Sequence, residues 1–298
     1  MLVLHASQKK RSSAIDSTSA LSKMPVEEIT FENSAHHVLS GTLKYPDSPD
    51  PKRFPPVLVL HGFGSHSDHE LISNLANFIY PFGYASLRFD FHGHGKSTGK
   101  RQEVHITQKI DDIISAISFV ESHNLVIEKQ VTLIGHAMGA DTAILTAARD
   151  ERIKCLVLLA SRSDLSKHKA MFSPTDLEDM KKWGVCEHCQ HGTISKDFLA
   201  HLDKYDIKEE LKKINIPVIF INGDSDFQVP FQNAKELYFA ANEPKRFEII
   251  PDGDHWFRNP QSRQQLMDLI MNWVNRYIKQ ALTYESETTE RLSRARLT

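Results

Sequence analysis

Apolar residues along the chain gather in short continuous runs, and between the runs they recur at helical intervals. Such runs are typical of strands that are buried on both faces. They lie at Val57 to Leu60, Tyr84 to Phe89, Gln130 to Ile134, Cys155 to Ala160, Pro217 to Asn222 and Arg246 to Ile250. Before them, patterned stretches near Ile29 and from Val38 to Tyr45 predict antiparallel edge strands.

The intervening segments carry apolar residues every three or four positions, which predicts amphipathic helices. These helices are expected from Leu71 to Ile79, from Ile106 to Ser122, from Asp141 to Ala148 and from about Gln261 to Gln280. Strands alternating with helices predict an α/β fold with a doubly wound, mostly parallel sheet. The alternation breaks once, at about residues 163–214, a polar and helix-prone stretch without a core strand. We expect this insertion segment to cover the sheet where a substrate lid would lie.

Composition narrows the class of protein. The chain has 298 residues, of which 40% are hydrophobic and 25% charged, as in ordinary globular proteins. We expect one α/β domain at residues 24–281, followed by a polar tail at 282–298. The net charge of −2 gives no basic surplus for a nucleic-acid partner. No apolar run reaches the ~18 residues of a membrane span, and the oligomeric state stays open.

The first 23 residues are rich in serine and carry Lys9, Lys10, Arg11 and Lys23. We interpret them as a disordered extension, with organellar targeting as the alternative. Three cysteines argue against a disulfide framework and for a reducing compartment, and hence for a cytoplasmic protein.

Four segments follow predicted strands, at the edge of the sheet where ligands of such folds bind. They are His61-Gly-Phe-Gly64, Gly135-His-Ala-Met-Gly139, Gly223-Asp-Ser-Asp-Phe-Gln-Val-Pro230 and Gly253-Asp-His-Trp-Phe257. In the last two, His255 is the candidate general base, and Asp226 is the candidate carboxylate that orients it, with Asp224 as the alternative. An ordinary turn with two loop acids is the plainer interpretation of the third segment.

These motifs resemble the α/β-hydrolase superfamily, and the likeness extends from about Glu27 to Ile278. Within it the chain is similar to cinnamoyl and feruloyl esterases, monoacylglycerol lipases and serine aminopeptidase-like hydrolases. The resemblance implies cleavage of a small-molecule carboxylic ester through an acyl-enzyme, without a cofactor. The nucleophile, acid and histidine positions, 137, 226 and 255, occur in the order expected of these proteins.

The resemblance also assigns site residues. Gly135 to Gly139 match the nucleophile elbow, but the serine position holds Ala137, and a methyl group cannot attack a carbonyl. The backbone N–H groups of Phe63 and Met138 would form the oxyanion hole. The residues expected to contact substrate are His61, Gly62, His136, Trp183 and Trp256.

No neighbour of Ala137 is expected to replace the serine. His136 and Met138 point elsewhere in a tight turn, and Asp141 is expected to face the following helix or solvent. Three interpretations stay open: an ester hydrolase whose nucleophile has been replaced, a non-catalytic protein that binds a carbonyl compound, and a lyase or cofactor-free oxygenase that uses a His255–Asp226 base.

One further cluster lies in the insertion segment. Cys186-Glu-His-Cys189-Gln-His191 contains one C-x₂-C pair with nearby histidines. Zinc could use both cysteines with one or two of His168, His188 and His191, although zinc ribbons normally have two such pairs. We therefore expect no metal, and we consider a redox dithiol weaker still.

Overall fold

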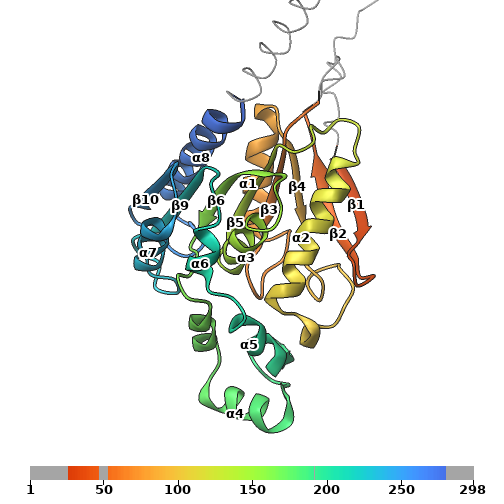
Figure 1. Ribbon diagram of the computed structural model, residues 1–298, viewed down its shortest axis with the longest axis vertical. Helices are drawn as coiled ribbons and strands as arrows, with labels where there is room; N and C mark the ends of the chain where they lie inside the picture. The colour runs from red at the N-terminus through yellow and green to blue at the C-terminus, as the bar shows by residue number, and fades with distance from the viewer. Residues whose placement is uncertain (1–25, 47–52, 191, 280–298) are drawn as a thin grey trace, which may run out of the picture.

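The structure is a computed structural model and describes residues 26–46, 53–190 and 192–279 (Figure 1). These residues form an eight-stranded sheet with helices on both faces. The strands of this sheet are β1 (Val26–Glu32), β2 (Val38–Lys44), β3 (Pro56–Leu60), β4 (Ala85–Phe89), β5 (Val131–His136), β6 (Ile153–Leu159), β9 (Val218–Gly223) and β10 (Lys245–Ile250).

The helices lie mostly between consecutive strands. They are α1 (Glu70–Ile79), α2 (Ile106–Glu121), α3 (Met138–Ala147), α4 (Pro174–Trp183), α5 (Lys196–Leu202), α6 (Ile207–Leu211), α7 (Gln232–Ala240) and α8 (Pro260–Val274). Short helical turns are η1 (Tyr80–Phe82), η2 (Arg101–Glu103), η3 (Leu165–Met171) and η4 (Asn275–Lys279).

The sheet runs in the order β1-β2-β4-β3-β5-β6-β9-β10. β1 pairs antiparallel with β2, and β2 antiparallel with β4, whereas every later pair is parallel. Every residue of β3, β4, β5 and β9 is buried, which explains their continuous apolar sequences. The predicted doubly wound, mostly parallel sheet is confirmed.

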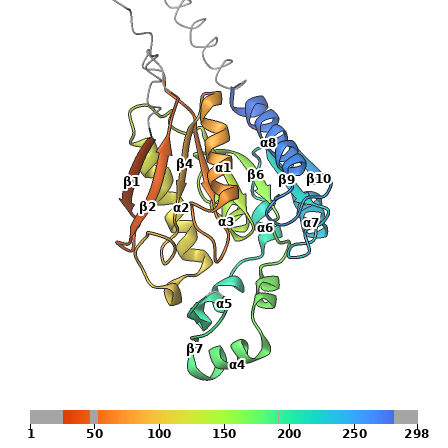
Figure 2. The same cartoon turned by 180° about the vertical axis from the view of Figure 1, so that it is seen from behind.

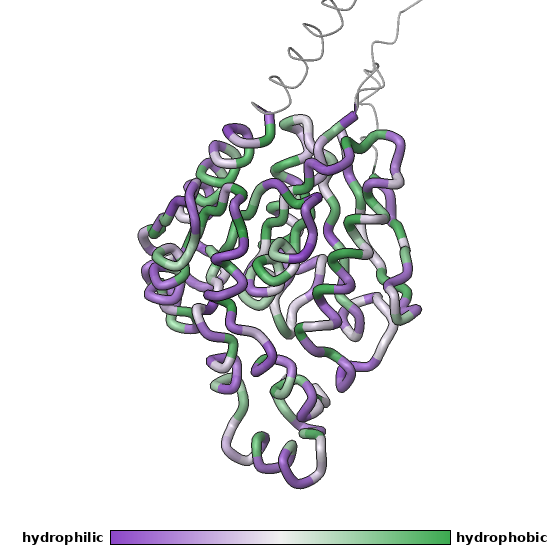
Figure 3. The backbone as a smooth tube through the Cα atoms, in the orientation of Figure 1, coloured by the Kyte–Doolittle hydropathy of each residue, from purple (hydrophilic) through white to green (hydrophobic). Residues whose placement is uncertain are grey.

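Two apolar cores cover the two faces of the sheet. One contains the inner residues of α2, α3 and α7, and the other those of α1 and α8. Figure 2 shows α1 and α8 in front of the sheet, on the side opposite to α2 and α3. In Figure 3 hydrophobic positions gather on the strands and on the helix faces that touch them. The helix α7 was not predicted, because only Asn233, Ala234 and Leu237 of it are buried and its apolar stripe is weak.

The insertion segment leaves the sheet after β6 and returns at β9. It contains η3, α4, a small hairpin of β7 (Val185–Cys186) and β8 (Ile194–Ser195), α5 and α6. Figure 1 shows α4 and α5 projecting beyond one end of the sheet. Among the described residues, no helix is both long and apolar enough to cross a bilayer.

The predicted domain limits at residues 24 and 281, the extension at 1–23 and the tail at 282–298 all lie outside the described residues.

Candidate functional site

Ala137 occupies a sharp turn between β5 and α3. Its backbone has φ 50° and ψ −122°, a conformation that costs an alanine of order 1–3 kcal/mol and persists only where the surrounding structure enforces it. Two carbonyl groups hold the turn. The N–H of Ala137 donates to Leu159 O at 2.8 Å, and Ala140 N donates back to Ala137 O at 2.9 Å. The turn therefore has the strained strand-to-helix geometry of a nucleophile elbow.

The glycines on either side of Ala137 are required by close packing. A Cβ atom on Gly135 would lie 2.5 Å from the backbone of Ala140, and one on Gly139 would lie 2.5 Å from the carbonyl oxygen of Leu60. Both distances are shorter than any real Cβ contact, so only glycine fits at either position. This packing sets the start of α3 directly against the end of β3.

His255 and Asp226 meet beside this turn. The Nδ1 atom of His255 lies 2.8 Å from Oδ2 of Asp226, and both side chains are buried. The other carboxylate oxygen of Asp226 accepts the backbone N–H groups of Gln228 and Val229, at 2.9 and 2.8 Å. Because an ionised carboxylate only accepts hydrogen bonds, the contact is made by Nδ1–H of His255, which leaves Nε2 as the ring nitrogen that can exchange a proton. Asp224, the alternative acid, is exposed and bonds to the Ser225 hydroxyl instead.

A central cavity of about 610 Å³ opens beside these residues. Its wall includes Ala137 and Met138 from the turn, Gly62 and Phe63 from the loop after β3, and His255 and Trp256 from the loop after β10. The cavity also touches the insertion segment at Lys167, His168, Ala170, Met171 and Gln190. With Phe227 and Gln228 after β9, five segments thus converge on one cavity at the carboxyl ends of the strands, after β3, β5, β6, β9 and β10.

His61 and His136 lie behind the cavity wall, not in it. His61 is fully buried, and its Nε2 accepts the backbone N–H of Phe91 at 3.2 Å. His136 is also fully buried, and its Nε2 donates to the carbonyl of His255 at 2.8 Å. Burial holds the pKa of each imidazole well below its usual 6.5. Both histidines therefore support the loops of the site as neutral rings, and their prediction as substrate contacts is not supported by their positions.

Trp183 is also outside the cavity. It is 68% exposed at the end of α4, where the ammonium of Lys182 lies 4.7 Å from its ring. It lines a separate surface hollow with Asp179 and His188. The sequence could not place it, because the path of the insertion segment decides which of its aromatic residues face the sheet.

Asp141 faces the next helical element, η3, and not solvent, so the first of its two expected orientations is the one observed. It is fully buried, and its Oδ2 lies 2.6 Å from Nε2 of His168, a residue of η3 and of the cavity wall. Its Oδ1 accepts the Ser161 hydroxyl at 2.7 Å and the backbone N–H of Arg162 at 2.8 Å. Sequence reasoning did not connect His168 and Arg162 with this cavity. The sequence signal that could have indicated this contact was Asp141 itself, an acidic residue among the small and apolar residues of the first half of α3.

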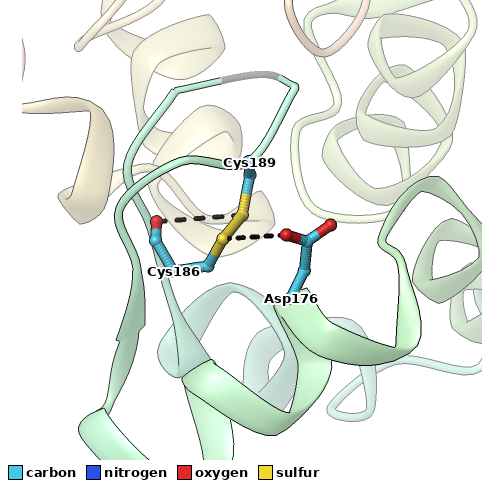
Figure 4. Close-up of side chains that lie close together, drawn as sticks. All are labelled: Asp176, Cys186 and Cys189. Carbon is cyan, nitrogen blue, oxygen red and sulfur yellow. Dashed lines mark hydrogen bonds between the residues drawn. A yellow bond between two sulfur atoms is a disulfide. The ribbon is translucent and has the colours of Figure 1, made fainter.

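The cysteine cluster is a disulfide, which is the oxidised form of the dithiol alternative and differs from the zinc interpretation. Cys186 and Cys189 are joined by a disulfide, because the β7–β8 hairpin brings their Cα atoms within 5.9 Å (Figure 4). Asp176 lies beside them, with Oδ1 3.2 Å from Sγ of Cys186. Of the proposed histidine ligands, His168 pairs with Asp141, His188 lines the surface hollow, and residue 191 lies outside the described residues. In the disulfide state the two sulfurs are not thiolates, which are the form that binds zinc.

Comparisons with known proteins agree with this fold. Residues 52–184 match the family model described as serine aminopeptidase, S33. The protein named "Uncharacterized protein YfhR" from Escherichia coli (strain K12) is 24% identical over 237 residues, which cover 77% of this chain and 75% of that protein.

Solved structures share the fold. The Butyrivibrio proteoclasticus protein Est1E with bound ferulic acid superposes with a TM-score of 0.72 at 19% identity, over 83% of this chain and 99% of that one. The esterase domain from a Rhodothermus marinus protein gives a TM-score of 0.68 at 23% identity, over 86% of this chain and 100% of that one. Together with the mostly parallel sheet and its flanking helices, these matches show that the chain has the α/β-hydrolase fold.

Proposed function

We propose that the central cavity binds a carboxylic ester and that this chain has lost the covalent step of ester hydrolysis. The observation that carries the proposal is the hydrogen bond between His255 and Asp226 beside a cavity that also contains Ala137. An acid, a base and a strained turn are retained around a residue that cannot act as a nucleophile. The chain would therefore be an esterase-like protein with very low activity.

Backbone groups would bind the ester carbonyl. Met138 is the first residue of α3, and the N–H groups of a first helical turn have no acceptor within the helix. We assign its N–H and that of Phe63, on the opposite loop of the cavity wall, to the oxyanion hole. Because both donors are main-chain groups, they do not depend on the side chain at position 137.

His255 would act as the general base. With Nδ1–H donated to Asp226, its Nε2 is the atom that can take a proton. In a serine hydrolase that proton comes from the serine hydroxyl, whereas here only water or the ligand could supply it. Enzymes of this kind that lack one triad member keep roughly 10³–10⁴-fold catalysis over water, from binding and the oxyanion hole.

The comparisons with solved structures support a ligand that contains an acyl group, but they do not identify the ligand of this chain. The Est1E structure holds ferulic acid, an aromatic carboxylic acid, in a protein of the same fold. We propose that the present cavity takes a ligand of comparable chemistry.

A second candidate is a base-dependent reaction without a covalent intermediate. The intact His255–Asp226 pair favours it, because a protein that only binds a ligand has no need of an oriented base. This candidate predicts turnover by the unmodified chain with a bell-shaped dependence of rate on pH.

Binding and turnover can be measured separately in the chain as it exists. We expect p-nitrophenyl butyrate hydrolysis to stay close to background, and saturation-transfer NMR to detect binding of methyl butyrate. Replacing Ala170 on the cavity wall by tryptophan should abolish that binding, whereas Ala35→Trp, at an exposed position outside the cavity, should not. Absence of binding to the unmodified chain, or equal binding by Ala170→Trp, would contradict the proposal.

A further inference from the structure

The wall of the central cavity carries positive charge and no carboxylate. Among the described residues that line it, Arg162 and Lys167 are the permanently charged ones, and His168 and His255 are the others that titrate. A ligand that enters the cavity therefore meets cations and imidazole rings. Two carboxylates, Asp141 and Asp226, are in contact with those two imidazole rings.

Both carboxylates are already fully engaged by hydrogen bonds. Asp226 accepts two backbone N–H groups and Nδ1 of His255. Asp141 accepts the hydroxyl of Ser161, the N–H of Arg162 and Nε2 of His168. Neither forms an ion pair with the guanidinium of Arg162, in the part of the chain that the structure describes.

The guanidinium of Arg162 differs from the ammonium of Lys167 in its hydrogen bonding. Its backbone is fixed by the hydrogen bond to Asp141, yet within residues 26–46, 53–190 and 192–279 its side chain has no hydrogen-bond partner. Burial lowers the pKa of Arg162, and the charges of Asp141 and Asp226 act in the opposite direction. An arginine remains charged at neutral pH in such surroundings, and the side-chain N–H donors of Arg162 are not taken up by acceptors among the described residues. These donors are therefore available to a pair of ligand oxygens in the cavity.

Lys167 contributes less than Arg162 to the binding of an anion. Its ammonium donates to the Ser163 hydroxyl and to Oδ1 of Asn233, both at 2.9 Å. Asp164 and Glu236 lie close enough to interact with its charge. Its positive charge is therefore partly offset from outside the cavity, which leaves Arg162 as the main anion-binding group.

We infer that the ligand of this cavity carries a carboxylate in addition to its ester, and that Arg162 binds that carboxylate. The inference rests on the proposed ester binding and names the substrate class, a monoester of a dicarboxylic acid. The planar guanidinium can bind both oxygens of a carboxylate at once, which is the strong form of this interaction. Asp141 is then a positioning residue that fixes the backbone of Arg162.

A different role for Arg162 makes different predictions. If it served only to offset the charges of Asp141 and Asp226, its removal would change stability but not the preference of the cavity for charged ligands. The charge preference of binding therefore separates the two roles.

The test compares monomethyl glutarate, which has one carboxylate and one ester, with dimethyl glutarate, which is neutral. We expect calorimetric titration of the unmodified chain at pH 7.5 to show at least about tenfold tighter binding of the monoester. In Arg162→Gln this ratio should fall to within about twofold, while Arg162→Lys should keep an intermediate ratio. Arg53→Gln, which removes an exposed arginine paired with Glu128 outside the cavity, should keep the full ratio.

Each outcome is decisive. Equal binding of the two esters by the unmodified chain overturns the inference but leaves ester binding intact, whereas failure of both to bind overturns the proposed function as well. A full preference retained in Arg162→Gln excludes Arg162 as the anion-binding group. If that variant does not fold, the salt dependence of the unmodified chain decides, because the preference must shrink as NaCl rises from about 20 to about 500 mM.

Discussion

His255 and Asp226 are 29 residues apart in the sequence, and their side chains lie 2.8 Å apart in the structure. They reach this distance because their loops leave neighbouring parallel strands, β10 and β9, at the same edge of the sheet. Two backbone hydrogen bonds join the loops. Ser225 donates its N–H to the carbonyl of Gly253 at 3.0 Å, and Asp224 donates to Ile250 at 3.1 Å.

This contact predicts a large cost for any side chain at Gly223. A Cβ atom there would lie 1.8 Å from the carbonyl oxygen of Gly253, so the two loops must separate. We expect Gly223→Ala to lower the free energy of unfolding by roughly 3 kcal/mol or more. Urea denaturation of Gly223→Ala and of the unmodified chain measures this loss of free energy. Gly184→Ala is the matched control, because a Cβ there meets open space and only its positive φ of 83° disfavours alanine. Equal losses in the two variants would show that the loops do not depend on this contact.

Much of the site could be predicted from residues that follow strands. The order of the strands along the chain is encoded in apolar runs that are typical of a buried parallel sheet. Ala137, Asp226 and His255 lie just after the carboxyl ends of such runs. Of the two candidate acids, Asp226 contacts the histidine and Asp224 is exposed, so Asp226 stays the proposed acid.

Contacts made by the insertion segment could not be predicted. His168 and Asp141 are 27 residues apart in the sequence, and their contact depends on how η3 packs against α3. No periodic pattern encodes such a placement, because the segment packs through a few buried residues instead of a regular face. For the same reason Trp183 was predicted in the cavity but lies on the surface, and Arg162 was overlooked.

The strained turn predicts opposite effects of glycine at two neighbouring positions. At Ala137 the positive φ disfavours a Cβ atom, so Ala137→Gly should raise the free energy of unfolding by about 1 kcal/mol. At Ala140, within the helix α3, Ala140→Gly should lower it by about 1 kcal/mol. Thermal and chemical denaturation of the two variants give the comparison. A loss of stability in both would mean that Ala137 is not strained.

Buried neutral histidines predict a loss of stability in acid. Burial holds the folded-state pKa of His61 and His136 well below 6.5, whereas in the unfolded chain each titrates near 6.5. The unfolded state therefore binds more protons as the pH falls through 6.5. Stability is fully present above that value and declines below it, by about 1 kcal/mol per histidine between pH 7 and 5.5.

A variant at His136 measures the contribution of one of these histidines to the pH dependence of stability. His136→Gln can still donate to the carbonyl of His255 but does not titrate, so its loss of stability between pH 7 and 5.5 should be smaller by about 1 kcal/mol. His36→Gln, at a side chain that is 88% exposed, should follow the unmodified chain. The same pH dependence in His136→Gln and in the unmodified chain would argue against a neutral, buried His136.

Restoring a hydroxyl at position 137 tests the central claim most directly. The backbone of Ala137, the base His255 and the acid Asp226 are in place, so a serine should need no further change. Hydrolysis of p-nitrophenyl acetate and butyrate should be measured for the unmodified chain, for Ala137→Ser and for the double variant Ala137→Ser/His255→Gln. We predict that kcat/KM rises by at least about 100-fold in Ala137→Ser and returns to background in the double variant. A folded Ala137→Ser protein whose activity stays within about threefold of background would contradict the account of this chain as a serine-hydrolase scaffold without its nucleophile.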